Sequence, residues 1–235
     1  MKILGIDSSA KSASVAVTDN GKILSSFYIN TGLTHSQTLM PMLDSALKCA
    51  SLKVEDLDLI AVNKGPGSFT GIRIGVATAK GLADTKNIKT VGISTLESMA
   101  YNLKMNDCIA VAVMDARCDQ VYTAFFRITK GSVSRLIDDC AVAISELKEM
   151  LKKYGETLIL VGDGADICYR ALRTEIPSIL IASETNKYQN ATGVCLAAED
   201  KNSDEYISSK ELIPEYLRLP QAERELKNKL KKVSE

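Results

Sequence analysis

The sequence has little of what metal or general-base chemistry requires. It contains a single histidine, His35, and none of its six cysteines forms a C-x-x-C pair. A metal-binding H-x-x-x-H pair would need a second histidine at position 39, and that residue is Leu39. No cysteine or carboxylate lies within one helical turn of His35, so the sequence disfavours a zinc or iron site. Catalytic Ser-His-Asp and Cys-His arrangements could form only around this one imidazole, which disfavours a peptidase as well.

A surplus of charge of either sign is also missing. The 29 Lys and Arg residues balance the 29 Asp and Glu residues, whereas proteins that bind RNA directly usually carry a basic surplus. Any contact with RNA should therefore be local or supplied by a partner. The longest uninterrupted apolar run, residues 108–114, is far too short to cross a bilayer, and residues 1–5 do not read as a signal peptide. We expect a soluble, cytoplasmic protein with reduced thiols and no membrane contact.

The first half of the chain predicts three strands followed by alternating helices and strands. A turn signal, Asn20-Gly21, joins the second strand to the third. The first helix should begin with a capping box formed by Thr34 and Gln37. The predicted ranges are strands at 2–8, 13–17 and 22–29, a helix at 34–52, a strand at 57–62, a glycine-rich loop at 63–71, a helix to about 83, a strand at 89–93 and a helix from 95 capped by Ser94.

The order of elements begins again at Cys108. The second half predicts strands at 108–115, 120–128 and 133–137, a helix at 146–154, a strand at 157–161, a loop at 162–164 before another helix, a strand at 177–181 and a helix near 190. Such a repeat indicates an α/β protein of two lobes with a central cleft. We therefore expect one lobe at 1–104, a second at 105–219 and a charged helix or tail at 220–235.

An aspartate ends the first strand of each half, and a glycine loop precedes a helix in each half. Exposed amides at a helix start favour anions, so these features form a candidate nucleotide site. Neither loop has the Walker A sequence, and turns or caps are the alternative explanation. The candidate residues are Asp7, Ser8, Ser9, Gly65, Gly67, Ser68, Gly71, Asp115, Gly162 and Gly164.

Glycines inside the helix that follows the first loop need a separate explanation. Each costs about 1 kcal/mol relative to alanine, which a helix tolerates where something packs close to its backbone. Gly75, Ala79 and Ala83 repeat at a spacing of four residues and allow close approach. This face could pack against the protein's own sheet or against a partner helix, because Arg73 and Lys80 border it.

Three stretches together resemble the TsaB family, formerly called YeaZ. They are residues 3–9 (ILGIDSS), 35–42 (HSQTLMPM) and 65–75 (GPGSFTGIRIG), and the last is the most specific. Weaker matches lie at 114–117 (MDAR), 162–165 (GDGA) and 214–218 (PEYLR), so the resemblance covers residues 1–218. It implies the duplicated actin/Hsp70/sugar-kinase fold, which is ribonuclease H-like. It also implies a paralogue of TsaD, the protein that forms threonylcarbamoyladenosine in tRNA.

The resemblance implies a scaffold subunit that lacks the catalytic metal of TsaD. Such a subunit binds and activates TsaD, recruits the ATPase TsaE and is required for threonylcarbamoyl transfer to adenosine 37 of ANN-decoding tRNAs. It contacts tRNA only through the complex and forms a homodimer when alone. We expect no cofactor, apart from a nucleotide at the partner interface. The alternative is an ATP-binding phosphotransferase or hydrolase that acts alone.

The resemblance places the partner interface on the helices at 34–52 and 70–83. An apolar stripe on the first helix and the small face of the second could form a four-helix contact with the same pair on a partner. The predicted interface residues are His35, Leu39, Met42, Leu43, Ala46, Arg73, Gly75, Val76, Ala79 and Lys80.

Overall fold

A computed structural model describes residues 1–218 of the chain, and residues 219–235 lie outside the description. The charged helix or tail expected at 220–235 therefore falls outside it as well. Within residues 1–218, no helix combines the length and the apolar character that a membrane span needs.

The first of two five-stranded sheets is built around β1. β2 and β3 add antiparallel on one side, and β4 and β5 add parallel on the other, which gives the order β3-β2-β1-β4-β5. The strands are β1 (Lys2–Asp7), β2 (Ala13–Asp19), β3 (Lys22–Ile29), β4 (Leu59–Gly65) and β5 (Lys89–Ser94).

The second sheet repeats this pattern around β6. Its order is β10-β9-β6-β7-β8, with β6–β7 and β7–β8 antiparallel and β6–β9 and β9–β10 parallel. The duplication predicted from element order is thus confirmed at the level of strand pairing. The strands are β6 (Cys108–Asp115), β7 (Gln120–Thr129), β8 (Ser132–Ala143), β9 (Leu158–Val161) and β10 (Ile179–Ile181).

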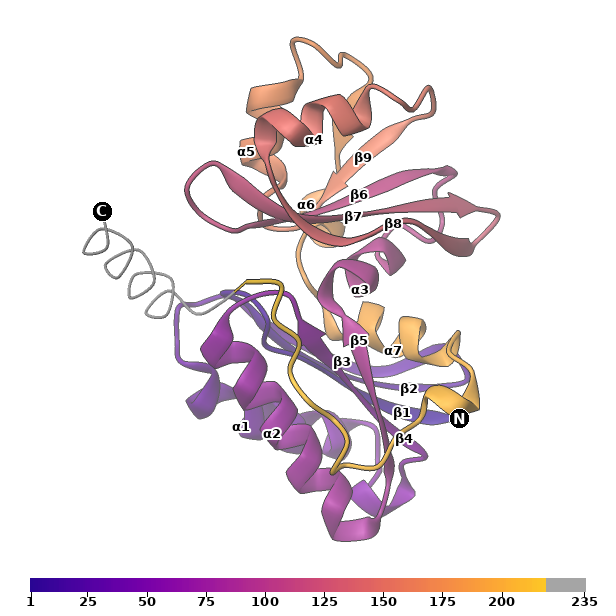
Figure 1. The fold of residues 1–235 in the computed structure, drawn as a ribbon. Helices are drawn as coiled ribbons and strands as arrows, with labels where there is room; N and C mark the ends of the chain where they lie inside the picture. Colours follow the sequence, from indigo (N-terminus) through magenta and orange to yellow (C-terminus); the bar gives the residue numbers. More distant parts are fainter. Residues whose placement is uncertain (219–235) are drawn as a thin grey trace, which may run out of the picture.

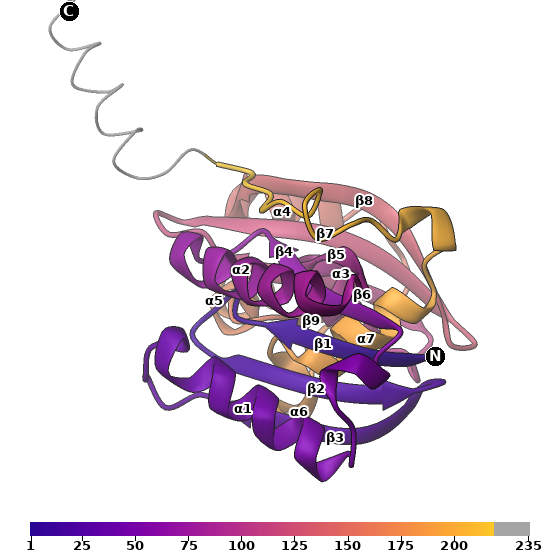
Figure 2. The ribbon, with the colours of Figure 1, turned by 90° about the horizontal axis from the view of Figure 1, so that it is seen from below.

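The helices form three layers around the two sheets (Figure 1). α1 and α2 cover the outer face of the first sheet, where they contact each other and lie side by side in Figure 2. α4 and α5 cover the second sheet, and α3 and α7 lie between the sheets. The bounds are α1 (His35–Cys49), α2 (Phe69–Lys86), α3 (Thr95–Tyr101), α4 (Ile144–Leu151), α5 (Ala165–Leu172), α6 (Glu184–Lys187) and α7 (Ala191–Glu199), with 3-10 turns η1 (Val54–Asp56) and η2 (Ser203–Glu205).

The layer between the sheets joins the two halves through apolar packing. Leu96 and Met99 of α3 are fully buried in the core of the second sheet. Val194 and Cys195 of α7 are fully buried in a core beneath the first sheet, together with Tyr101 from the end of α3. Burial of this extent on both sides removes apolar surface of both sheets from water and holds the lobes together.

The chain returns to the first lobe after α6, which changes the boundary expected from the sequence. α7 packs on β1 and β2, although residues 105–219 were assigned to the second lobe. The segment at 207–218, which we call the C-terminal strap, then runs beside α2 (Figure 1). Ile207 pairs with Thr90 at the edge of β5, Leu212 is buried in the first core, and Arg218 donates to the Ala116 carbonyl of the second lobe at 2.8 Å.

One predicted local feature is wrong. Thr34 is the N-cap of α1 in backbone conformation, but its side chain makes no capping hydrogen bond, so the capping box with Gln37 does not form. Ser94 behaves as predicted, because its Oγ accepts a hydrogen bond from Glu97 N at 3.2 Å. The hairpin predicted at Asn20-Gly21 is confirmed, since both residues have the positive φ that a type I′ turn requires.

Candidate functional site

Asp7, the candidate nucleotide-binding aspartate in the first half of the chain, is fully buried at the end of β1. Its Oδ1 accepts hydrogen bonds from Ser9 N (3.1 Å), Ser9 Oγ (2.6 Å) and Asn63 Nδ2 (2.8 Å). Burial raises the pKa of this carboxyl, although the donors from Ser9 and Asn63 and the charge of His35 lower it. Oδ1 of Asp7 is therefore engaged by hydrogen bonds within the fold.

The first glycine loop packs so tightly against the turn after β1 that it uses its polar groups internally. Ser68 N donates to the Ser9 carbonyl at 2.7 Å, and Ser8 Oγ donates to the Gly71 carbonyl at 2.9 Å. A Cβ on Gly67 would overlap the Ser9 carbonyl, and one on Gly71 would overlap the Ser8 carbonyl. These glycines permit close packing within the chain, and the Ser68 amide is already bonded.

The second glycine loop is engaged in the same way. Gly162 N donates to the Lys187 carbonyl at 2.6 Å, and Gly164 N donates to the Val113 carbonyl at 3.2 Å. Gly162 has φ 117°, a conformation that favours glycine. The two loops thus resemble each other in how their amides are satisfied.

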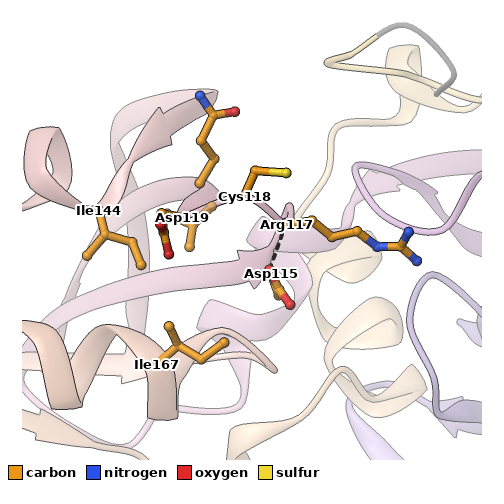
Figure 3. Close-up of a pocket in the computed structure, with 8 residues that line it drawn as sticks. Asp115, Arg117, Cys118, Asp119, Ile144 and Ile167 are labelled. Carbon is orange, nitrogen blue, oxygen red and sulfur yellow. Dashed lines mark hydrogen bonds between the residues drawn. The ribbon is translucent and has the colours of Figure 1, made fainter. Parts of the chain in front are cut away.

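Asp115, the counterpart of Asp7, lies in a different environment. It is exposed, its Oδ1 accepts a hydrogen bond from Arg117 N at 2.7 Å, and it lines an open cavity of about 330 Å³ (Figure 3). Ile144 and Ile167 face this cavity from α4 and α5, and Arg117 points away from it (Figure 3). The two aspartates at equivalent places in the sheets therefore do not share an environment.

A second cavity of about 330 Å³ lies where β5, α3, β8 and the C-terminal strap meet. Charged side chains from both lobes cross it. Arg135 lies 3.5 Å from Glu97, and Ser94 Oγ donates to Asp139 at 2.5 Å. Ion-paired side chains therefore line this cavity.

The apolar stripe predicted as the partner interface belongs to the core of the chain. Leu39 is only 1% exposed, and the other members are buried as well. The small face of α2 is equally internal, because a Cβ on Gly75 would lie 2.5 Å from Ser8 Oγ and 3.4 Å from Val62 Cγ2. The predicted interface residues that are buried against the first sheet are Leu39, Met42, Leu43, Ala46, Gly75, Val76 and Ala79.

The two charged residues predicted at the interface hold the C-terminal strap. Arg73 Nε donates to the Tyr216 hydroxyl at 2.8 Å, and the Tyr216 ring stacks on Phe69 with centroids 4.7 Å apart. Lys80 Nζ donates to the carbonyls of Lys210 and Leu212 at 3.3 and 3.0 Å. The strap also explains Gly65, where a Cβ would overlap the Glu215 carbonyl. No local pattern in the sequence pairs α2 with a segment more than 130 residues away.

His35 joins the start of α1 to the turn after β1. Its Nε2 lies 2.7 Å from the Ala10 carbonyl, and its ring rests against Gly71. Among residues 1–218, no three His, Cys, Asp or Glu side chains are grouped so that they could hold a metal ion. Leu39, one turn further along α1, points into the core.

What remains available on α1 and α2 is the side that faces away from the sheet, which we call the outer face. Leu33 and Met40 are 58% and 52% exposed there, although both are large and apolar. On α2, Gly81 is exposed and has no atom within 4 Å of the position its Cβ would take. The outer face comprises Leu33, Met40, Pro41 and Asp44 at α1 and Thr70, Ala77 and Gly81 on α2.

Comparison with known proteins places the chain in a family. The family model described as TsaD, tRNA N6-adenosine threonylcarbamoyltransferase, matches residues 30–226. The tRNA threonylcarbamoyladenosine biosynthesis protein TsaB of Bacillus subtilis is 29% identical over 95% of this chain and 96% of its own length. The protein of the same name from Escherichia coli is 31% identical over 70% of this chain and 72% of its own length. The chain belongs to the TsaB family.

A solved structure agrees with the fold of this TsaB-family chain. A protein from Pseudomonas aeruginosa described as similar to peptidase YEAZ superposes with a TM-score of 0.76 at 22% identity, covering 92% of this chain and 99% of its own. At this identity the likeness shows the fold alone. The predicted duplicated α/β fold is confirmed by this likeness and by the two sheets of matching strand order.

Proposed function

We propose that the chain is a scaffold subunit in the biosynthesis of threonylcarbamoyladenosine in tRNA. In this proposal it has no catalytic activity of its own and binds and activates a TsaD-like paralogue, which transfers the threonylcarbamoyl group to adenosine 37 of ANN-decoding tRNAs. It contacts tRNA only through that complex, in the cytoplasm. Recruitment of a TsaE-like ATPase is proposed from the family alone. The names of the Bacillus subtilis and Escherichia coli relatives support the pathway.

The observation that carries a partner-binding role is the outer face of α1 and α2. The two helices pack side by side on one sheet, so their outward sides form one continuous surface. Met40 and Leu33 expose more than half of their area on it, and the neighbouring positions on α2 are small. Exposed apolar side chains on a surface of this shape are typical of a helix-pair contact.

Gly81 gives the strongest residue-level support for this surface. A glycine inside a helix costs about 1 kcal/mol relative to alanine. Gly71 and Gly75 are explained by close contacts within the chain, but Gly81 has nothing near it among the described residues. A partner backbone that approaches α2 closely would explain why a side chain is missing there. Ala77 lies one turn earlier on the same side and keeps the approach open.

The same surface can also meet a second copy of the chain. An isologous contact places α1 and α2 of one copy against the same helices of the other, so one face serves both states. The proposed homodimer and the proposed complex with the TsaD-like paralogue therefore compete for the outer face. Addition of the paralogue should convert a dimer of this chain into a heteromeric complex.

The test uses Gly81→Leu and a matched control, Gly155→Leu. Both glycines have open space where a Cβ would go, so both variants should fold, and Gly155 lies in the second lobe after α4. Gly81→Leu places a bulky side chain on the outer face, whereas Gly155→Leu leaves that face unchanged. Gly75→Leu is unsuitable because its side chain would disrupt the core around Ser8.

Binding is measured by co-purification and analytical ultracentrifugation with the cognate TsaD-like protein. We expect wild type and Gly155→Leu to form the complex and Gly81→Leu to lose it, while Gly81→Leu keeps a native circular dichroism spectrum and melts no lower than wild type. Full binding by Gly81→Leu, with a native fold, would show that the partner does not use the outer face of α2.

A further inference from the structure

Two buried oxygen atoms at neighbouring strand ends have no hydrogen-bond donor among residues 1–218. They are Asp7 Oδ2, at the end of β1, and Asn63 Oδ1, in β4. The strands are parallel neighbours, with Ile6 opposite Val62, so the two side chains stand next to each other. Asn63 Nδ2 already donates to Asp7 Oδ1 at 2.8 Å. The carboxyl and the amide are thus joined by one hydrogen bond, and Asp7 Oδ2 and Asn63 Oδ1 are left bare.

Counting donors shows what this pair lacks. Asp7 Oδ1 receives three donors, two from Ser9 and one from Asn63. A carboxylate and an amide oxygen are both acceptors, so they cannot satisfy each other, and a bare buried acceptor is unfavourable. A single proton placed on Asp7 Oδ2 turns one of the two acceptors into a donor. This proton gives both unpaired oxygens a hydrogen-bond partner.

We propose that Asp7 carries a proton on Oδ2 in the folded protein and donates it to Asn63 Oδ1. The carboxyl and the amide then form a ring closed by two hydrogen bonds, which fastens the end of β1 to β4. The proton comes from water, and no other bond changes. In this role Asp7 is a neutral positioning residue that holds the two strand ends together, and it is not a ligand of a metal or a phosphate.

The surroundings of Asp7 favour the neutral form. Asp7 and Asn63 are 0% and 1% exposed, and burial raises the pKa of the Asp7 carboxyl. His35 on α1 is the basic side chain nearest in effect to Asp7 among the described residues, and its contribution lowers the pKa of the Asp7 carboxyl. Tyr28 on β3 also lies near Asp7, and the pKa of its phenol is raised, chiefly by burial. No lysine or arginine of the described part acts on Asp7.

The proposal fixes the sign of a pH effect. Below the ordinary pKa of aspartate, both the folded and the unfolded chain hold the proton. Between that value and the raised value of the folded state, only the folded chain holds it, so stability falls as pH rises. Above the raised value the loss is complete. Over this window the unfolding constant should increase by up to about tenfold per pH unit from this group alone.

The decisive variant is Asp7→Asn. Its amide donates to Asn63 Oδ1 and accepts from Asn63 Nδ2, so it reproduces the two-bond ring without a titrating proton. We expect Asp7→Asn to match wild type near pH 4 and to become the more stable protein as pH rises. The control is Asp44→Asn, because Asp44 is exposed on α1 and paired only with Lys48. This control should not change the pH dependence in the same way.

A spectroscopic readout keeps the proposal testable if Asp7→Asn folds poorly. Infrared spectra of wild type near neutral pH should contain a carbonyl band of a protonated carboxyl, which Asp44→Asn keeps and Asp7→Asn lacks. Wild type labelled with ¹³C at the aspartate carboxyls should likewise show a carboxyl that stays protonated well above pH 4 and that is missing in Asp7→Asn. Absence of both signals would overturn the proposal.

A bound cation is the competing occupant of the same two oxygens. In that case Mg²⁺ or Ca²⁺ would raise the melting temperature of wild type, Asp7→Asn would lose this response, and no protonated carboxyl would be seen. If Asp7→Asn is much less stable than wild type at every pH between 4 and 8, the ring is also wrong. Unchanged melting with either cation, together with the acid band, is the result that the proposal predicts.

Discussion

A methyl group added at Gly75 and one added at Gly81 should change the stability of the protein in opposite directions. Both glycines lie inside α2, but Gly75 faces β1 and Gly81 faces away from the sheet. Replacement of a helix-interior glycine by alanine stabilises by about 1 kcal/mol when nothing else changes. Gly81→Ala meets no atom within 4 Å and should keep this gain.

At Gly75 the same gain is outweighed by crowding. The new Cβ would lie 2.5 Å from Ser8 Oγ, so either Ser8 or the helix must move. Inserting a methyl group into a packed core costs about 1–3 kcal/mol. Displacing Ser8 Oγ also weakens its hydrogen bond to the Gly71 carbonyl, which is worth about 1 kcal/mol. The sum, less the helix gain, is a net loss of about 1–3 kcal/mol for Gly75→Ala.

Urea unfolding monitored by circular dichroism measures both variants against wild type. We expect the midpoint to rise for Gly81→Ala and to fall for Gly75→Ala, with similar slopes. If Gly75→Ala is stabilised as much as Gly81→Ala, the Gly75 side of α2 does not pack against β1. The assignment of inner and outer faces, on which the proposed partner surface depends, would then be refuted.

Three further predictions concern caps, the strap and the thiols. Ser94→Ala should lower the free energy of unfolding in urea by about 1 kcal/mol because it removes a helix cap. Thr34→Ala should lower it by almost nothing because the Thr34 side chain makes no capping bond. Equal losses for the two variants would contradict the caps described. Tyr216→Ala should destabilise the protein by about 1–2 kcal/mol, because it removes the ring stacking on Phe69 and the hydrogen bond from Arg73. It should also increase proteolysis near residue 216, which limited digestion followed by mass spectrometry measures. A thiol reagent at pH 8 should modify the exposed Cys49 and Cys118 quickly. Cys108, Cys168 and Cys195 should react only after unfolding, because they are buried and burial raises the pKa of their thiols to about 11, 12 and 12 respectively.

The element order could be predicted from the sequence because its signals are local. Strand alternation, the Asn20-Gly21 turn and the Ser94 cap each act over a few residues. The repeat of that order in both halves then predicted two similar sheets. The return of α7 to the first sheet could not be predicted, because burial of Val194 and Cys195 depends on which sheet lies nearby in three dimensions.

The candidate site residues, too, could be predicted only where the signal is local in the sequence. Asp7 and most of the glycines marked as unusual in the sequence do lie at close contacts, but the atoms they contact are those of the chain itself. Small residues spaced four apart look the same whether a sheet or a partner lies opposite them, so the sequence does not tell which side of α2 faces the sheet. Asn63 was missed because a single amide in an apolar strand carries no motif. Its significance comes only from its position beside Asp7.

The most direct test of the proposed role is threonylcarbamoyl transfer to tRNA by the cognate TsaD-like protein, measured with and without this chain and supplied with the other components of the pathway. We predict that transfer requires the chain, that Gly155→Leu supports it fully and that Gly81→Leu does not. Transfer by this chain in the absence of the TsaD-like protein, or full transfer with Gly81→Leu, would contradict the account.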